Sequence, residues 1–396
     1  MIAEKMESLV SNNSVIRQMF EEGRVMAARY GSENVYDFSL GNPNVPAPAK
    51  VGEVIKELLD HEDPVALHGY MPNAGFPDVR AKIAASLNSR FGTGFTADNI
   101  IMTVGAAGGL NCALKAITDP GDEILTFAPY FLEYRNYAAN HGGILKEIPP
   151  DTSTFQPDLT ALLEAVGPRT KALIINNPNN PSGVIYTEET IKGIAKVLED
   201  KQKEYGTDIF ILSDEPYREL VYSGAEVPYI TKYYSNTIVG YSFSKTLSLP
   251  GERIGYLVIP DEVSDHEKVF EACVIANRIL GFVNAPSLMQ KVVGECLDEK
   301  TDIGFYAENR DLMYDALTEM GYECIRPDGA FYMFIKSPAE DEKEFVNAAK
   351  EEHILLVPGS SFACSGFVRL SYCVSHETCR NSLPGFKRLA DRFMGQ

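Results

Sequence analysis

Residues 170–215 read TKALIINNPNNPSGVIYTEETIKGIAKVLEDKQKEYGTDIFILSDE, and this stretch decides the fold class. The runs ALII at 172–175 and IFIL at 209–212 are short, apolar and bounded by polar or turn-forming residues, as buried strands are. Residues 188–206 between them have the length and composition of a helix. A strand, a helix and a second strand in succession predict two parallel strands of one sheet, with the helix covering it.

The same alternation continues on both sides of this unit. Strands are expected at residues 99–105, 122–130 and 236–244, and a helix at 106–117. The chain is therefore expected to have the α/β fold class, with a large domain whose mostly parallel sheet is flanked by helices.

The C-terminal part has a different pattern. Strands at 329–336 and 367–374 are expected there among helices at 341–352 and 376–393. This pattern predicts a smaller α+β domain formed by the N- and C-terminal segments. We expect the large domain to span residues 46–285, and the small domain to combine residues 1–45 with 286–396.

Composition limits the possible partners. The 396 residues carry a formal net charge of −19, and 45% of them are apolar and 23% charged, as in a soluble globular protein. Such an acidic surface argues against nucleic acids and anionic membranes as partners. No apolar run approaches the ~18–20 residues of a membrane span, and the start, MIAEKMESLVSNNS, lacks the apolar core of a signal peptide.

The cysteines and histidines show no ligand pattern. The seven cysteines form no CxxC pair, and the six histidines have no metal-ligand spacing. We interpret His68 and His141 as structural, and Cys364 and Cys373 as packing residues. Reduced cysteines and the absent signal peptide predict a cytoplasmic protein. The absence of a ligand spacing predicts that the protein has no metal site.

Polar residues follow three of the expected strands. Asn180 comes after ALII, Asp214 after IFIL, and Lys245 after TIVGY at 237–241. Ligands of an open parallel sheet gather beyond the carboxyl ends of its strands, so an amide, a carboxylate and an amine are expected along one edge. Taken singly, each residue has a plainer interpretation, such as a surface lysine, a cap or a turn.

An anion site is expected beside this edge. TVGAAGGL at 103–110 places small residues at a strand-to-helix turn, where backbone N–H groups can approach a phosphate. Ser242, Ser244 and Arg253 add hydroxyl and guanidinium donors. A phosphate anchor, an amine for an aldehyde and a carboxylate for a pyridine nitrogen together match pyridoxal 5'-phosphate.

The chain resembles the class I/II aminotransferases of the aspartate aminotransferase superfamily, which have pyridoxal phosphate fold type I. The similarity covers nearly the whole chain and includes, in order, GNP at 41–43, HGYMPNAGFPDVR at 68–80, APYF at 128–131, NNPNNPSG at 176–183, SDEPY at 213–217, SFSKTLSLPGERIGY at 242–256 and FVRLSY at 367–372. Many relatives carry Gly or Ser residues at the phosphate turn, where this chain has Ala106 and Ala107.

The resemblance implies the residues of the cofactor site. Lys245 would form the Schiff base, Asp214 would pair with the pyridine nitrogen, and Tyr217 would donate to the ring oxygen. The other implied contacts are Asn180 at the ring oxygen, the backbone of Ala106 and Ala107 with Ser242, Ser244 and Arg253 at the phosphate, and Phe131 stacked on the ring.

The resemblance also implies the substrate contacts and the assembly. Arg369 would bind the α-carboxylate of the substrate, with Gly41 and Asn180 nearby. Tyr70 would reach the phosphate of the neighbouring subunit, so the working unit is expected to be a homodimer with shared active sites.

The substrate side chain is left open. Members that act on acidic substrates often carry a second cationic residue before the Asn-x-Pro motif, which is residues 284–286 here. Ile279 falls at that place and Arg278 lies beside it, so a dicarboxylate substrate is in question. Aspartate, alanine and aromatic amino acids all remain candidate donors.

The expected activity is transamination between an amino acid and a 2-oxo acid. Lys245, Asp214 and Tyr217 would be catalytic, with Lys245 as general base and acid. A carbon–sulfur β-lyase or a synthase would share every cofactor residue and stays open as an alternative. A non-enzymatic cofactor sensor fused to a DNA-binding module is a poor fit, because residues 1–40 are too short for that module and the chain is acidic.

Overall fold

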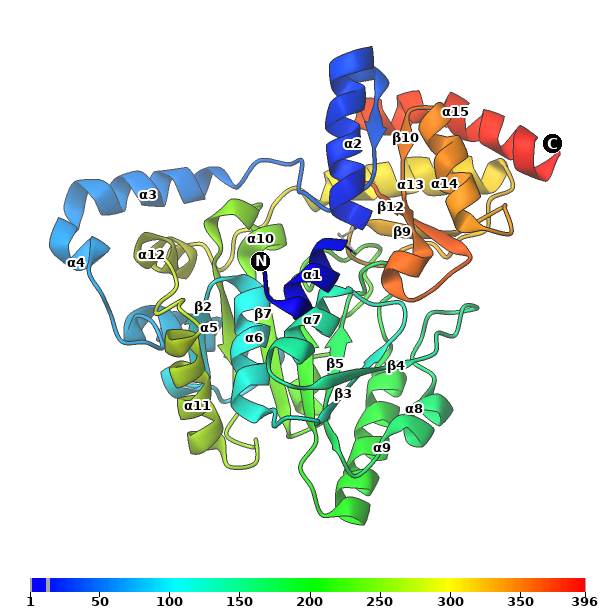
Figure 1. Cartoon of the computed structure of the whole chain (residues 1–396). Coiled ribbons are helices and arrows are strands. Elements are labelled where there is room, and N and C mark those ends of the chain that lie inside the picture. The colour runs from blue at the N-terminus through cyan, green and yellow to red at the C-terminus, as the bar shows by residue number, and fades with distance from the viewer. Residues whose placement is uncertain (1, 12–14, 396) are drawn as a thin grey trace.

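The computed structural model describes residues 2–11 and 15–395. Residues 1 and 12–14, which belong to the start where no signal peptide is expected, lie outside the described residues, as does residue 396. Figure 1 shows a large sheet with its helices in the lower part of the molecule, and a second group of helices around smaller sheets above it.

The large sheet has seven strands. In spatial order they are β2 (Ile100–Thr103), β8 (Gly255–Val258), β7 (Thr237–Ser242), β6 (Phe210–Asp214), β5 (Thr170–Asn176), β3 (Glu123–Phe127) and β4 (Ile144–Ile148). Strand β8 pairs antiparallel with β2 and β7, and all the other pairings are parallel. The expected mostly parallel sheet is therefore confirmed.

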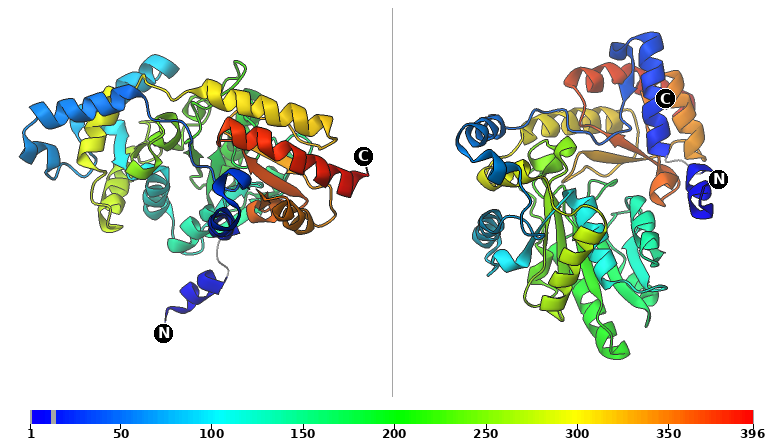
Figure 2. Two further views of the ribbon diagram at one scale, coloured as in Figure 1. Left: turned by 90° about the horizontal axis from the view of Figure 1, so that it is seen from above. Right: turned by 60° about the vertical axis from the view of Figure 1, so that its left-hand side comes forward.

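Helices cover both faces of this sheet, as Figures 1 and 2 show. One face packs against α6 (Gly105–Ile117), α7 (Glu133–Asn140) and α11 (His266–Ile279). The other face packs against α5 (Pro77–Phe91), α8 (Leu159–Ala165), α9 (Glu188–Tyr205) and α12 (Ser287–Glu295), and α3 (Ala49–His61) packs against α12. Because Leu212 faces the first layer and Ile211 the second, both are buried, which explains the continuous apolar runs in the sequence.

Helix α9 shows how local sequence sets an element's limits. The Thr187 side chain accepts a hydrogen bond from the backbone N–H of Thr190 and caps the start. Gly206 ends the helix with a left-handed conformation at φ 65°, which glycine adopts without steric cost. The structure thus agrees with the helix expected at residues 188–206.

The second group of elements surrounds two smaller sheets. A three-stranded antiparallel sheet has the order β11 (Val357–Pro358), β12 (Phe367–Ser371) and β9 (Tyr332–Lys336), and β1 (Tyr36–Asp37) pairs in parallel with β10 (Ile354–Leu355). The long helices here are α2 (Val15–Tyr30), α13 (Ile303–Glu319), α14 (Glu342–Glu351) and α15 (His376–Met394). The remaining short helices are α1 (Glu4–Ser11), α4 (Pro64–His68) and α10 (Phe243–Thr246).

The boundary between the two domains at residues 285 and 286 stays a prediction. The pairing of β1 with β10 joins the N-terminal segment to the C-terminal part of the chain. Helix α12 follows the expected boundary in sequence, yet it packs against α3 and α5 beside the large sheet. Helix α13 is the first helix after the boundary that packs against α15.

The strand expected at residues 236–244 is shorter than the sequence suggested. Strand β7 ends at Ser242, and the short helix α10 begins at Phe243. The cause is local, because the Ser242 side chain accepts a hydrogen bond from the backbone N–H of Ser244 and caps the new helix. Lys245 consequently lies on α10, immediately beyond the carboxyl end of β7.

Candidate active site

A cavity of about 320 Å³ lies at the carboxyl ends of β5, β6 and β7. Every predicted site residue except Tyr70 lines it: Gly41, Ala106, Ala107, Phe131, Asn180, Asp214, Tyr217, Ser242, Ser244, Lys245, Arg253 and Arg369. We call this space the front cavity. The fold thus brings together residues that are spread over most of the chain.

The Lys245 amine lies inside this cavity. Its Nζ donates a hydrogen bond to the Gly41 carbonyl oxygen at 2.6 Å and lies 5.3 Å from the centre of the Phe331 ring. Burial lowers the pKa of Lys245 to about 8, with smaller contributions from the positive charges of Arg253 and Arg369 and against the opposing effect of Cys373. A lysine with this pKa holds a substantial neutral fraction near neutral pH, as a nucleophile or base requires.

The Asp214 carboxylate ends β6 and is buried. The Tyr134 hydroxyl donates to its Oδ2 at 2.5 Å, whereas Oδ1 is buried and has no hydrogen-bond partner among the residues that the structure describes. Burial raises the pKa of Asp214 to about 7, against the effect of the Tyr134 hydrogen bond and with a contribution from Glu215. An unpartnered buried carboxylate oxygen is costly, so this position is prepared for a cationic donor.

The neighbouring Glu215 has a different environment. Its carboxylate accepts a hydrogen bond from the Ser213 hydroxyl at 2.7 Å and forms a buried ion pair with Arg218. Glu215 is therefore satisfied within the protein, and Asp214 is the carboxylate of this pair that faces the cavity.

One end of the front cavity is suited to an anion. Helix α6 begins at Gly105, and its N-cap residue, Val104, makes no side-chain capping hydrogen bond. The backbone N–H groups near Ala106 and Ala107 are thus available, and a helix N-terminus favours negative charge. Gly105 has φ 74°, and a Cβ there would lie 2.7 Å from Arg253 Nη2, so glycine is needed for this approach.

Hydroxyl groups complete the anion-binding end. Ser242 Oγ and Ser244 Oγ lie 2.7 Å apart, and both residues are buried. The Arg253 guanidinium donates to the backbone carbonyls of Pro250 and Val104 at 2.9 and 3.4 Å. No carboxylate pairs with Arg253 among the described residues, so its charge is left for a ligand.

The opposite end holds the second arginine. Arg369 lies on β12, and its Nη1 and Nη2 donate to Asn180 Oδ1 at 3.1 Å and to the Ser39 carbonyl at 2.5 Å. Arg369 Nε is buried and has no partner within residues 2–11 and 15–395, and desolvation lowers the pKa of this guanidinium. A buried guanidinium with a free donor and no paired carboxylate is suited to bind a substrate carboxylate.

Aromatic residues form much of the remaining wall. Phe131 packs edge-on against Tyr134, with ring centres 5.8 Å apart. The Tyr217 hydroxyl lies 2.8 Å from that of Tyr332, and burial raises the pKa of Tyr217 well above its usual value. Gly41 passes close to this pair, because a Cβ at residue 41 would lie 1.9 Å from the Tyr332 hydroxyl.

Tyr70 lies away from the front cavity. Its side chain is 94% exposed and lines a shallow hollow with His68 and Phe282. Ile279 and Arg278, at the end of α11, are exposed and do not line the front cavity. The chain alone therefore brings one predicted substrate-binding arginine, Arg369, to this cavity.

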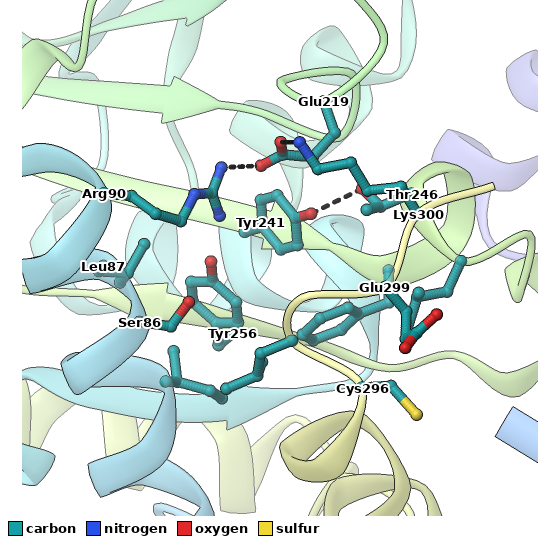
Figure 3. A pocket seen from close by; sticks show the side chains of 14 residues that line it. Ser86, Leu87, Arg90, Glu219, Tyr241, Thr246, Tyr256, Cys296, Glu299 and Lys300 are labelled. Carbon is teal, nitrogen blue, oxygen red and sulfur yellow. Dashed lines mark hydrogen bonds and ion pairs between the residues drawn. The ribbon is translucent and has the colours of Figure 1, made fainter. Parts of the chain in front are cut away.

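A second and much smaller cavity, of about 20 Å³, lies on the other side of the β7–α10 segment, and Figure 3 shows it. We call it the rear cavity. Glu219 is held there between Arg90 and Lys300, with Lys300 Nζ 3.3 Å from its carboxylate. The hydroxyls of Tyr241 and Thr246 lie 2.6 Å apart.

The sequence-based prediction missed several lining residues, above all Tyr134 and Tyr332. Tyr134 follows Phe131 by three residues at the start of α7, and this helical spacing was the available signal. Tyr332 follows GAF at the start of β9, but nothing in its local sequence indicates a contact with Tyr217, 115 positions earlier.

The remaining expectations concern metals, cysteines and membranes. Over residues 2–11 and 15–395, no group of three or more His, Cys, Asp and Glu side chains is arranged to hold a metal ion. All seven cysteines are free thiols. The Nε2 of His141 lies 3.3 Å from the amide oxygen of Asn111, which fits a structural role. Within the same residues, no helix has the length and apolarity to cross a bilayer.

Comparisons with known proteins identify the family. The family described as "Aminotransferase class I and II" matches residues 33–384. A crystal structure of an amino transferase from Eubacterium rectale has 51% sequence identity and a TM-score of 0.97, and the match covers 99% of each chain. The "Aspartate/prephenate aminotransferase" of Thermus thermophilus is 31% identical over 89% of this chain and 90% of its own length.

A further relative carries a different substrate name. The "Probable N-acetyl-LL-diaminopimelate aminotransferase" of Bacillus subtilis is 33% identical over 89% of this chain and 88% of its own length. The names thus agree on the reaction and differ on the amino acid. The chain belongs to the class I and II aminotransferases, a pyridoxal-phosphate-dependent family, and it is an enzyme that transfers an amino group from an amino acid to a 2-oxo acid.

Proposed function

We propose that the front cavity binds pyridoxal 5'-phosphate and that Lys245 is the residue bonded to it. One observation carries this proposal. The buried Lys245 amine, the unpartnered Oδ1 of Asp214 and two arginines without carboxylate partners share one cavity. These are the groups that an aldehyde, a pyridinium nitrogen, a phosphate and a substrate carboxylate require.

The donor set fits the cofactor from end to end. The N-terminus of α6, Ser242, Ser244 and Arg253 would hold the phosphate, and Asp214 would accept a hydrogen bond from the pyridinium N–H. Tyr217 and Asn180 would donate to the ring oxygen, and Phe131 would cover the ring. When bound, the cofactor supplies an electron-withdrawing ring that stabilises negative charge at the substrate Cα.

The chain's own residues would divide the remaining work. Lys245, with its pKa near 8, can take a proton from the substrate Cα and return it elsewhere. Arg369 would fix the α-carboxylate through two parallel hydrogen bonds and so orient the Cα–H bond. Asn180 already accepts from Arg369, which ties the carboxylate end to the ring-oxygen position.

A trapping experiment tests the assignment of Lys245. Borohydride treatment of the protein with cofactor should abolish the visible absorption band and leave a stable secondary amine on Lys245, identified by peptide mapping. In a second experiment, an amino donor should convert the cofactor to its amine form. Incubation with cystathionine should release no pyruvate and ammonia, which separates transamination from β-lyase chemistry. Labelling of another lysine would overturn the assignment.

The substrate is best sought with a panel of donors. The relatives' names include aspartate, prephenate and N-acetyl-LL-diaminopimelate, and the front cavity holds one arginine, Arg369, at its substrate end. We propose a panel of acidic, aromatic and small neutral amino acids with 2-oxoglutarate, followed at the cofactor's absorption band. The donor with the highest kcat/KM defines the class.

We further propose a homodimer in which Tyr70 serves the partner's site. Its 94% exposure is unusual for a tyrosine flanked by apolar neighbours and fits a residue that another chain covers. One charge-assisted hydrogen bond to the partner's phosphate would contribute about 1.5–3 kcal/mol. A cytoplasmic location stays a prediction.

Subunit mixing tests this sharing. Tyr70→Phe and Lys245→Ala subunits are each expected to be impaired alone, whereas a mixed dimer has one site with both changes and one with neither. Part of the activity should therefore return on mixing. A fully active monomer in sedimentation, or no recovery when the subunits demonstrably exchange, would contradict the shared site.

A further inference from the structure

Tyr332 lines the front cavity and contacts two of its polar residues, Tyr217 and Arg369. It begins β9, is 2% exposed and belongs to the smaller three-stranded sheet, whereas the proposed cofactor residues lie on strands of the large sheet or on segments next to those strands. Its hydroxyl lies 2.8 Å from the Tyr217 hydroxyl, and its ring centre lies 4.6 Å from the Arg369 guanidinium carbon. One side chain thus contacts two residues with different proposed tasks.

The number of protons fixes the direction of the Tyr217–Tyr332 hydrogen bond. A tyrosine hydroxyl has one proton to donate. If Tyr217 donates its proton to the ring oxygen of the cofactor, as proposed above, its oxygen can only accept from Tyr332. Neither hydroxyl has another hydrogen-bond partner within the described chain. Tyr332 must therefore be the donor of this pair in the loaded enzyme.

In such a chain of hydrogen bonds, the first bond, from Tyr332 to Tyr217, strengthens the second, from Tyr217 to the ring oxygen of the cofactor. When Tyr332 donates to Tyr217, it polarises the Tyr217 hydroxyl and makes it a better donor to the ring oxygen. Loss of the Tyr332 hydroxyl would weaken that donation, and the ring oxygen would then hold its own proton more tightly.

The ring of Tyr332 has a separate contact. Arg369 lies over its face at 4.6 Å and over the Phe362 ring at 4.7 Å. Cation–π attraction to the two rings holds the desolvated guanidinium, while its Nε stays free for a carboxylate. The aromatic face thus keeps Arg369 in place in the absence of an acidic partner.

We infer that Tyr332 is a positioning residue that links the substrate-carboxylate arginine to the ring-oxygen donor, with its hydroxyl acting through Tyr217 and its ring through Arg369. The inference rests on the proposed cofactor site. Four other titratable groups surround the Tyr217–Tyr332 pair. They are Asp214 on β6, Lys245 on α10, Arg369 on β12 and Cys373 just after β12.

Two substitutions separate the hydroxyl from the ring. Tyr332→Phe keeps the ring, so the pH midpoint of the bound cofactor's visible absorption should rise by about half a unit, with the donor KM within about 2-fold of wild type. Tyr332→Leu removes both contacts, so the same rise in midpoint should come with a KM increase of about 10-fold. The absorption titration needs no turnover and reports on the bound cofactor alone.

Tyr222→Phe is the matched control. Tyr222 is a buried tyrosine of the same apolar cluster, and its hydroxyl donates to the Ala330 carbonyl at 2.5 Å, outside the front cavity. This variant should lower the melting temperature about as much as Tyr332→Phe and leave both the midpoint and KM unchanged.

The outcomes distinguish the two proposals. A midpoint that is unchanged or lower in Tyr332→Phe overturns the role of the Tyr332 hydroxyl, and a wild-type KM in Tyr332→Leu overturns the role of its ring. A wild-type protein that shows no visible band with pyridoxal phosphate rejects the cofactor site itself, whatever the variants do.

Discussion

The front and rear cavities lie on opposite sides of the same short segment, residues 241–246. Ser242, Ser244 and Lys245 line the front cavity of about 320 Å³, and Tyr241, Phe243 and Thr246 line the rear cavity of about 20 Å³. The segment therefore serves two different environments, with Tyr241 and Ser242 at the end of β7 facing opposite sides and the short helix α10 presenting residues to both.

The two cavities differ most in how their polar groups are satisfied. In the rear cavity Glu219 is paired with Arg90 and Lys300, and the hydroxyls of Tyr241 and Thr246 contact each other. In the front cavity an oxygen of Asp214 and the Nε of Arg369 are buried, and neither has a partner in the described part of the chain. A pairing that the protein completes itself supports structure, whereas one that it leaves incomplete indicates a ligand.

The rear cavity also supports Lys245 from behind. The backbone N–H of Thr301 donates to the Thr246 carbonyl at 2.8 Å, and its neighbour Lys300 pairs with Glu219. This contact holds the loop after α12 against α10. We therefore expect the charged residues of the rear cavity to affect stability and those of the front cavity to affect the reaction. Substitutions of matched residues in the two cavities test this expectation.

The largest contrast is expected between the two lysines. Lys245→Ala removes the amine proposed to move the substrate proton, so transamination should fall by roughly 10⁴-fold or more, while cofactor still binds through its phosphate. Lys300→Ala removes a lysine that is half exposed in the rear cavity, with 53% of its side chain accessible, and should keep activity within about 2-fold. Steady-state rates and cofactor absorbance measure both, and substantial turnover by Lys245→Ala would refute its role.

The two carboxylates form the second pair. Asp214→Asn loses the charge that would hold the pyridinium proton, so kcat should fall on the order of 10³-fold. Glu219→Gln should leave kcat within about 3-fold and lower the melting temperature by a few degrees, because Arg90 loses its buried counter-ion. The contrast would fail if Asp214→Asn turned over normally.

The sequence predicted the front cavity much better than the rear one. Lys245, Asp214 and Asn180 each follow a buried apolar run, so the rule for strand ends located them. The Arg90–Glu219 pair joins residues 129 positions apart, and no local motif marks such a contact. Tyr332 was missed for the same reason, because its contact with Tyr217 joins residues 115 positions apart.

Smaller differences have local causes. The end of β7 was placed two residues too late, since the hydroxyl of Ser242 competes with the strand ladder by capping α10. The antiparallel strand β8 was not anticipated either, because a connection from β7 through α10 can continue in either direction until packing decides. These features are set by packing between distant segments and not by the periodicity of apolar residues in the sequence.

Arg369→Lys should have an intermediate effect. Lysine keeps the charge but cannot make the two parallel hydrogen bonds, so the donor KM should rise and kcat/KM should fall about 100-fold. The absorption band of the bound cofactor should stay as in wild type, because Arg369 lies at the other end of the cavity from Arg253. Arg90→Lys is the control in the rear cavity and should leave KM unchanged. An unaltered KM in Arg369→Lys would mean that another group binds the carboxylate.

The smallest expected effect is on the stability of the cofactor-free protein. Burial raises the pKa of Asp214 from 3.8 to about 7, so the folded chain holds this proton more tightly than the unfolded chain does. The resulting stabilisation is complete below pH 4 and is lost as the pH rises through about 7. Asp214→Asn cannot ionise, so its free energy of unfolding relative to wild type should increase by about 2–4 kcal/mol between pH 4 and pH 8.

Urea unfolding of both cofactor-free proteins at pH 4, 6 and 8 measures this difference. The lowered pKa of Lys245 affects both proteins alike and cancels in the comparison. Adding pyridoxal phosphate should remove the advantage of the variant, because the pyridinium proton then stabilises the ionised Asp214 of the wild type. If the difference in free energy of unfolding between Asp214→Asn and wild type does not vary with pH, the unpartnered oxygen of Asp214 carries no electrostatic cost. The polar groups of the front cavity would then be as well satisfied as those of the rear cavity.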